Sequence, residues 1–166
     1  MGDSSRTPGA GDADQAKTID FERGIPFLVA ALGNKLSAIA STDVRRELGV
    51  GLMEWRILAL LAAEKDATPA RVGQVAGVDK SVVSRAATSL ERRGMITIAP
   101  EASASRQTRF TMTPEGAAVH LRGVDLAYRR NDDLLHGFTP EERKQLSELL
   151  RRATANLPRM ESKPRR

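Results

Sequence analysis

Apolar residues recur at intervals of three and four in several stretches of the chain, a spacing that predicts a mainly helical protein. The first stretch covers residues 25–42 and begins beside Pro26, a residue suited to the first turn of a helix. The second, residues 51–63, is apolar around most of its circumference, so we expect a helix buried on more than one side. The stripe of the first stretch consists of Ile25, Leu28, Val29, Leu32, Leu36 and Ile39.

Thr-Pro pairs mark the starts of three later helices, because Thr is a good N-cap and Pro is favoured at the first helical position. They begin at Thr68, Thr113 and Thr139. We expect the helix after Thr113 to end near residue 136 and the helix after Thr139 to be stopped by Pro158. Thr139 and Glu142 have capping-box spacing. The apolar stripe expected on the second of these helices is Ala117, Leu121, Val124, Tyr128 and Leu135.

Residues 68–93 read as two short helices joined by a tight turn. Gly77 permits the turn and Asp79 can cap the second helix, which Gly94 stops. Two β-like runs follow, at about 95–99 and 108–113, with a polar loop between them. The predicted fold class is therefore mostly α with a small β-hairpin, in one domain at about residues 21–158.

Composition narrows the possible classes of protein. The chain of 166 residues suits one domain, and an aromatic content of 4% favours packed helices over a large sheet. With no cysteine, disulfides, thiolate catalysis and cysteine-based zinc sites are excluded. Residues 1–20 read as a flexible arm and 159–166 as a basic tail. No stretch resembles a signal peptide or is judged long enough to span a bilayer, so we expect a cytoplasmic protein.

Net charge points to a polyanionic partner. The whole chain carries +5, and since residues 1–20 contribute −2, the remainder carries +7. A basic body suits nucleic acid or an anionic membrane surface. Charge alone fits an ordinary solvated basic surface equally well.

The helix after Gly77 has two chemically different faces. Val83, Ala87 and Leu90 would face the core, while small hydroxyls and one arginine lie opposite and can hydrogen-bond in a major groove. The hairpin beside it adds arginines that can contact phosphates or the minor groove. The alternative for the helix is an ordinary solvated face, and for Arg109 a solvent-facing strand position. The candidate DNA-binding residues are Lys80, Ser81, Ser84, Arg85, Thr88, Arg106 and Arg109.

Four segments in this order resemble the MarR family of winged helix–turn–helix transcriptional regulators: 51–61 (GLMEWRILALL), 78–85 (VDKSVVSR), 90–96 (LERRGMI) and 112–116 (MTPEG). The resemblance covers about residues 25–157. It implies a homodimer held by helices at about 25–42, 114–136 and 139–158, with a DNA-binding lobe at about 51–113. The hairpin would be the wing of that lobe.

The chain departs from the family pattern at two positions. The Asp-x-Arg of the family's wing is here Ala104-Ser105-Arg106, so the wing lacks an acid that commonly helps to fix it. Gly73 stands where the family usually has Ala, which lowers the intrinsic stability of that short helix.

The resemblance also implies an effector. Many members are repressors released by small aromatic or phenolic acids, some as CoA thioesters, bound between the dimerisation helices and the DNA-binding lobe. Arg45 and Arg46 would suit the phosphates of a CoA thioester. Alternatively, Trp55 is simply core and the arginines simply solvated. The candidate ligand-binding residues are Asn34, Ser37, Arg45, Arg46, Trp55, His120, Arg122 and Tyr128.

Catalysis has no support in the sequence. His120 and His136 lack metal-ligand spacing, and no P-loop, dinucleotide-binding pattern or nucleophile elbow occurs. We expect no enzyme, no metal and no cofactor. The leading hypothesis is a dimeric repressor on a pseudo-palindromic operator with half-sites about 10 bp apart. The alternatives are a winged-helix module that binds a protein instead of DNA, and a small helical enzyme.

Overall fold

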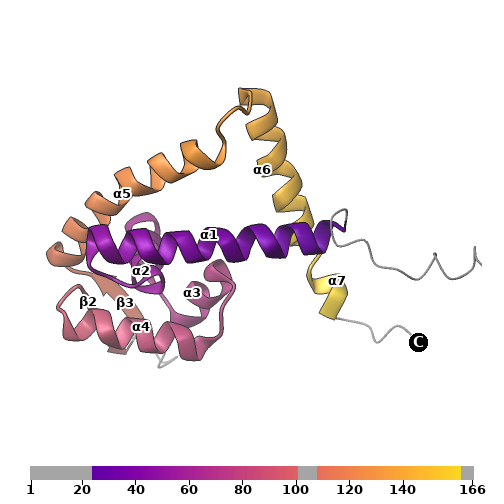
Figure 1. Cartoon of the computed structure of the whole chain (residues 1–166). Helices are drawn as coiled ribbons and strands as arrows, with labels where there is room; N and C mark the ends of the chain where they lie inside the picture. The colour runs from indigo at the N-terminus through magenta and orange to yellow at the C-terminus, as the bar shows by residue number, and fades with distance from the viewer. Residues whose placement is uncertain (1–23, 101–107, 162–166) are drawn as a thin grey trace, which may run out of the picture.

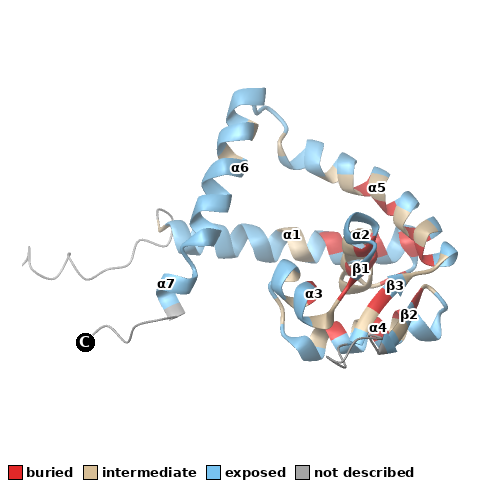
Figure 2. Cartoon of the chain, turned by 180° about the vertical axis from the view of Figure 1, so that it is seen from behind, coloured by how far each residue is buried: buried red, intermediate tan, exposed pale blue. Residues whose placement is uncertain are grey.

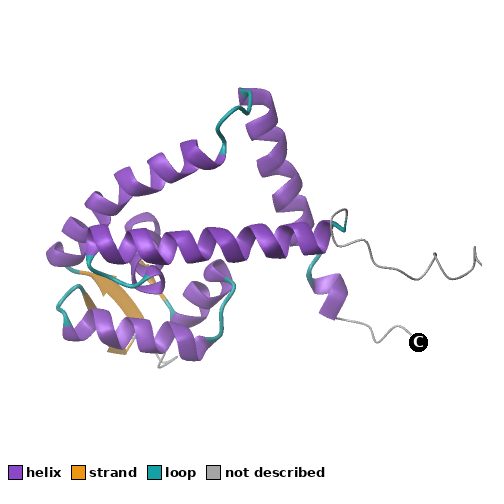
Figure 3. Ribbon diagram, in the orientation of Figure 1, coloured by secondary structure: helices purple, strands orange, loops and turns teal. Residues whose placement is uncertain are grey.

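The computed structural model describes residues 24–100 and 108–161. Helices dominate, and a small sheet closes one end (Figures 1 and 3), which confirms the predicted fold class. The predicted arm and most of the basic tail lie outside the described residues. In chain order the elements are α1 (Ile25–Leu48), α2 (Leu52–Glu64), β1 (Asp66–Ala67), α3 (Pro69–Ala76), α4 (Lys80–Arg92), β2 (Ile96–Pro100), β3 (Thr108–Met112), α5 (Pro114–Leu134), α6 (Pro140–Ala155) and α7 (Pro158–Glu161).

The sheet is antiparallel with strand order β1-β3-β2. Strands β2 and β3 form the predicted hairpin, in a register that pairs Ile98 with Phe110. Strand β1 was not predicted: its two residues pair with β3, Asp66 opposite Thr111. So short a strand has no periodicity of its own and exists because β3 offers it hydrogen bonds.

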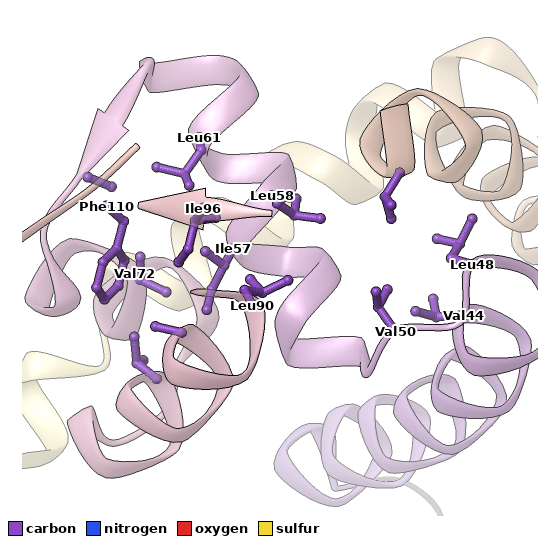
Figure 4. Packing of buried hydrophobic residues seen from close by; sticks show 14 of the residues in the cluster. Val44, Leu48, Val50, Ile57, Leu58, Leu61, Val72, Leu90, Ile96 and Phe110 are labelled. Atoms are coloured by element: carbon purple, nitrogen blue, oxygen red, sulfur yellow. The ribbon is translucent and has the colours of Figure 1, made fainter. Parts of the chain in front are cut away.

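One hydrophobic core holds α2, α3, α4 and the hairpin together as a lobe (Figure 4). Ile57 and Leu58 of α2 and Leu90 of α4 have no exposed surface. Every residue of α2 from Leu52 to Leu61 is at least partly buried, as its apolar circumference predicted. The core side chains around them are Leu61, Val72, Val83, Ala87, Ile96 and Phe110.

All three Thr-Pro helix starts are confirmed. The hydroxyl oxygens of Thr68, Thr113 and Thr139 accept hydrogen bonds from backbone N–H groups three residues on, each at 3.2 Å. The Glu142 carboxylate completes the capping box by accepting from the Thr139 N–H at 2.8 Å. These bonds depend on neighbouring residues alone, so the sequence suffices to predict them.

Two other helix-end predictions need correction. Asp79 is the residue before α4, but its side chain makes no capping hydrogen bond. Pro158 does not stop a helix: α6 has already ended at Ala155, and Pro158 opens the short helix α7. Proline is as compatible with the first turn of a helix as with its end.

Helix α5 packs on α2 with a face other than the predicted stripe. Its buried residues are Gly116, Val119, Gly123 and Leu126, whereas Leu121 is 67% and Tyr128 68% exposed. Small residues define the buried face: a Cβ on Gly116 would overlap the Met95 carbonyl oxygen. The close approach of the Met95 backbone and of the Trp55 ring, which the glycines allow, therefore helps to decide which face is covered.

Much of α1 and most of α6 remain uncovered (Figure 2). Only Ala40, Val44 and Leu48, near the C-terminal end of α1, are buried, while Ile25 is 66% exposed at its other end. Helix α6 contains no buried residue and extends away from the lobe. The exposed large apolar side chains of α1, α6 and α7 are Ile25, Phe27, Leu28, Val29, Leu32, Ile39, Leu149, Leu150 and Met160.

By length and composition, α1 is the single described helix that could cross a membrane. The sequence-based expectation that no stretch is long enough was therefore wrong. The mean hydropathy of α1 is high enough for a membrane span even with the isolated charge of Lys35. That charge lies mid-helix, where a bilayer penalises it by about 2.5–3.5 kcal/mol. Arg130 also donates to the Leu36 carbonyl of α1 at 3.1 Å. We interpret α1 as a helix that packs on protein.

Candidate functional site

Helices α3 and α4 are joined by a tight turn. Gly77 takes a left-handed conformation at φ 65°, and the Val78 N–H donates to the Gly73 carbonyl at 3.1 Å. A Cβ on Gly73 would lie only 2.9 Å from the Val78 carbonyl oxygen. The glycine that departs from the family pattern therefore accommodates a close approach of the turn.

One face of α4 is buried and the opposite face is exposed, as predicted. Val83 and Leu90 are 0% exposed and Ala87 is 1% exposed, so this face anchors the helix in the core. The opposite face is exposed, and α4 lies on the side of the lobe away from α5 and α6 (Figure 1). It brings together five of the sequence-predicted DNA-binding residues, all exposed: Lys80, Ser81, Ser84, Arg85 and Thr88.

The base of the wing is braced by an ion pair. Arg109 of β3 donates to the Asp66 carboxylate of β1 at 2.9 Å. Arg109 was predicted as a DNA contact, with a solvent-facing strand position as the alternative; the structure adds this acidic partner. The other wing candidate, Arg106, lies outside the described residues, as does Ala104.

We expect Asp66→Asn to lower the free energy of unfolding by no more than about 1 kcal/mol, because exposed ion pairs contribute little. Asp66 is 50% and Arg109 36% exposed at the side chain. Chemical denaturation measures the effect. A loss of several kcal/mol would show that the pair does more than brace an exposed strand.

A cavity of about 300 Å³ lies between α1, α2 and α5, where the lobe meets the long helices. Its wall is mostly apolar. Of the sequence-predicted ligand-binding residues, Ser37 and Trp55 line it. The complete lining is Leu36, Ser37, Ala40, Val44, Leu52, Trp55, Arg56, Gly123, Leu126, Ala127, Arg130, Asn131 and Leu134.

Arg130 lines the cavity and links two of its walls, α5 and α1. Its guanidinium donates to the Asp43 carboxylate at 3.5 Å and to the Leu36 carbonyl at 3.1 Å, joining α5 to α1. Beside it, Arg129 donates to Glu47 at 2.6 Å and makes a second α5–α1 link. The separation of these two helices therefore depends on charged contacts that an anionic ligand can compete for.

Trp55 fills the space between α2 and α5. Its Nε1 atom is buried and has no hydrogen-bond partner among the described residues. A Cβ on Gly123 would overlap the indole, so the glycine allows the ring to lie against the α5 backbone. An unsatisfied buried donor costs about 1–3 kcal/mol.

The other predicted ligand residues do not meet in this cavity. Asn34, Arg122 and Tyr128 are exposed and His120 is half-buried, and none of them belongs to the cavity wall. Arg45 and Arg46 line a separate hollow with Ser41 and Thr42. Arg46 is already ion-paired with Asp43 at 2.8 Å and Glu47 at 3.2 Å.

The polar residues that sequence reasoning missed are Arg56, Arg130 and Asn131. A signal for Arg130 was present in the helical spacing of α5. Gly123 and Leu126 precede Arg130 by seven and four positions, the intervals that place residues on one helix face.

One ion pair fixes α3 against the end of α2. Arg71 donates to Glu64 at 2.7 Å, and this hydrogen bond lowers the pKa of the Glu64 carboxyl. The same bond raises the pKa of Arg71. Both groups are exposed, so the contact orients α3 more than it stabilises the fold.

A helix–turn–helix anchored in its core through α4 and followed by a β-hairpin defines a winged helix–turn–helix protein. Residues 48–107 match the profile of the MarR family, and solved regulators of that family share the fold of most of the chain. The chain therefore has the sequence profile, over residues 48–107, and the fold of MarR family transcriptional regulators, as the motifs of its sequence predicted.

Three solved structures illustrate the similarity. A MarR/EmrR family regulator from Acinetobacter sp. ADP1 is 28% identical with a TM-score of 0.79, over 85% of this chain and 99% of that one. A MarR family regulator from Silicibacter pomeroyi is 28% identical with a TM-score of 0.70, over 84% and 96%. The PcaV regulator from Streptomyces coelicolor, solved with its natural ligand, is 26% identical with a TM-score of 0.70, over 83% and 96%. Comparison with curated proteins gives no match.

Proposed function

We propose that this regulator is a cytoplasmic homodimeric repressor that reads two operator half-sites and is released by a small aromatic acid. The observation that carries the DNA-binding part is the two-faced helix α4. Its apolar face is fixed in the core, so its hydroxyl and cationic face is presented on a rigid element.

Helix α4 supplies both kinds of DNA contact. Arg85 has the planar donor pair that matches the O6 and N7 acceptors of guanine, and Ser81, Ser84 and Thr88 can donate to bases or phosphates. Lys80 is at the helix N-terminus, where backbone N–H groups also favour a phosphate. We include Arg106 and Arg109 as wing contacts with phosphates or the minor groove.

The homodimer is supported by apolar surface that one chain leaves uncovered. Helix α6 is amphipathic but buries no residue, and the N-terminal half of α1 is exposed. Helices with apolar stripes are stable when these pack on another element. A second copy would cover both, with α5 completing the dimerisation region, and light scattering of the purified protein should give twice the chain mass of 18.0 kDa.

The cavity favours a small acid as effector. Its volume of about 300 Å³ is at the lower end of the range for ligand sites, which suits one ring better than a CoA thioester. Trp55 and the leucines would contact the ring, and Arg130 with Asn131 would bind the carboxylate. PcaV, a relative, was solved with a natural ligand. A carboxylate that draws Arg130 from Asp43 would loosen α5 from α1 and favour a dimer with altered half-site spacing.

We expect 4-hydroxybenzoate to raise the melting temperature by several degrees at saturating concentration, because a ligand that binds only the folded state stabilises it. The uncharged analogue 4-hydroxybenzyl alcohol should give little shift, and Arg130→Gln should remove the effect of the acid. A thermal-shift titration measures all three. Equal shifts with acid and alcohol, or an unchanged shift in Arg130→Gln, would contradict the assignment of Arg130.

Selection from a pool of random-sequence duplexes tests the DNA-binding function without a known operator. The regulator should enrich one inverted repeat, and its affinity should fall steeply with salt, since phosphate contacts release counterions. Enrichment of no sequence would refute specific DNA reading. Retained function in Arg85→Ala and Arg106→Ala would instead favour a module that binds a protein.

A further inference from the structure

Arg93 joins three segments at the end of the recognition helix α4. It is the residue that follows α4, and its guanidinium donates through Nη2 to the Gly49 carbonyl at 3.1 Å and through Nη1 to Glu54 Oε2 at 3.4 Å. Gly49 ends α1, and Glu54 lies in the first turn of α2. One side chain therefore connects the DNA-reading helix to the junction between α1 and α2.

The junction is itself well ordered by local bonds. Gly49 takes a left-handed conformation at φ 70°, and its N–H donates to the Arg45 carbonyl at 3.1 Å. The Gly51 N–H donates to Glu54 Oε2 at 2.6 Å, the oxygen that also accepts from Arg93. Glu54 is only 12% exposed at the side chain, so this carboxylate is held in place. Arg93 thus binds a fixed acceptor pair.

Residues on either side of the junction line the cavity. Leu52 and Trp55 of the first turn of α2 line the cavity on one side, and Glu54 lies between them in the sequence. Val44 of α1 lines it just before the junction. A displacement of α1 relative to α2 must therefore act on the two acceptors of Arg93.

We propose that Arg93 is a positioning residue for DNA recognition: it sets the orientation of α4 by clamping its C-terminal end to the α1–α2 junction. This rests on the proposed DNA-reading role of α4. Arg93 binds carbonyl and carboxylate oxygens of the protein, so its effect on DNA is indirect. Rotation of α4 about its core anchor would misalign the base-reading side chains and leave phosphate binding largely intact.

Arg92 provides a matched control. It is the last residue of α4, is exposed, and its side chain makes no hydrogen bond or ion pair within the described part of the chain. Arg92→Gln and Arg93→Gln remove the same charge from adjacent positions. A general loss of positive potential would affect both variants alike, whereas loss of the clamp affects only one.

The test compares affinity for the selected operator with affinity for a scrambled duplex, each across a salt series. Arg93→Gln should lower the operator-to-scrambled ratio about tenfold without changing the salt slope, and Arg93→Lys should recover part of it. Glu54→Gln should lower the ratio similarly, and the double variant should be no worse than either single one. Arg92→Gln should leave the ratio unchanged.

Each other outcome has a definite meaning. A smaller salt slope with parallel loss on both duplexes would make Arg93 a phosphate contact and overturn the proposal. A lower melting temperature with an unchanged ratio would make its role purely structural and also overturn it. A wild-type protein that selects no operator would overturn the proposed function itself, and this inference with it.

Discussion

Leu90→Ala is expected to lower the free energy of unfolding by about 3 kcal/mol, the middle of the range for a fully buried leucine. Leu90 has no exposed surface and lies where α4 meets Ile57 of α2 and Ile96 of β2 (Figure 4). Removing its side chain leaves a cavity between elements that hold one another in place. Helix α4 contacts water on its other face, so it has no alternative packing to compensate.

Chemical denaturation at a fixed protein concentration measures this loss, because the stability of a dimer depends on concentration. Arg92→Ala, an exposed change on the same helix, should stay within about 0.5 kcal/mol of wild type. A loss of less than about 1 kcal/mol in Leu90→Ala would mean that α4 is not anchored as described. The DNA-binding face would then lack the rigidity that the proposed function requires.

Arg85→Ala is expected to lower operator affinity about 100-fold while leaving stability close to that of wild type. A bidentate arginine–guanine contact contributes about 1–3 kcal/mol, and a symmetric dimer loses it in both half-sites. Arg85 is exposed and has no ion-pair partner among the described residues, so its removal leaves no protein group unsatisfied.

The pattern of loss matters as much as its size. Repeating the duplex selection with Arg85→Ala should give a motif that has become degenerate at one base pair of each half-site. The control, Arg92→Ala, should keep the full motif. An unchanged motif with uniformly weaker binding would assign Arg85 to the phosphate backbone.

The sequence predicted those features that depend on neighbouring residues. The cap at Thr139 and the turn at Gly77 each need only a few adjacent positions, and both are confirmed. The inner face of α4 was likewise correct, since Val83, Ala87 and Leu90 share one helical stripe in a short amphipathic helix. Adjacent residues are enough to predict the buried side chains wherever a helix buries a single face.

Features that depend on how elements meet were missed. The buried face of α5 is set by glycines that admit Trp55 and the Met95 carbonyl, not by its larger apolar residues. The side-chain contact between Arg130 and Asp43 joins positions 87 apart in the sequence, so no local pattern could reveal it. The spacing of α5 could have placed Arg130 on the face of Gly123 and Leu126, but not its contact with α1; of the residues proposed from the sequence, Trp55 and Ser37 do line the cavity.

Helix α1 has one feature that its own residues predict and another that depends on what packs against it. The helix itself was predicted correctly, but most of its predicted stripe, Ile25 to Ile39, is exposed in the single chain. The pattern identifies a surface to be covered and does not say by what. A second copy of the chain is our proposal for that cover, and it makes two recognition helices act on one operator.

Varying the spacing between operator half-sites tests the central claim most directly. If two α4 helices read one face of the duplex about 10 bp apart, inserting 5 bp between half-sites turns one of them to the opposite face. Affinity should then fall to that of a single half-site and recover partly when 10 bp are inserted. Affinity that is indifferent to spacing would contradict the account, because it would mean that the two recognition helices do not read DNA as a fixed pair.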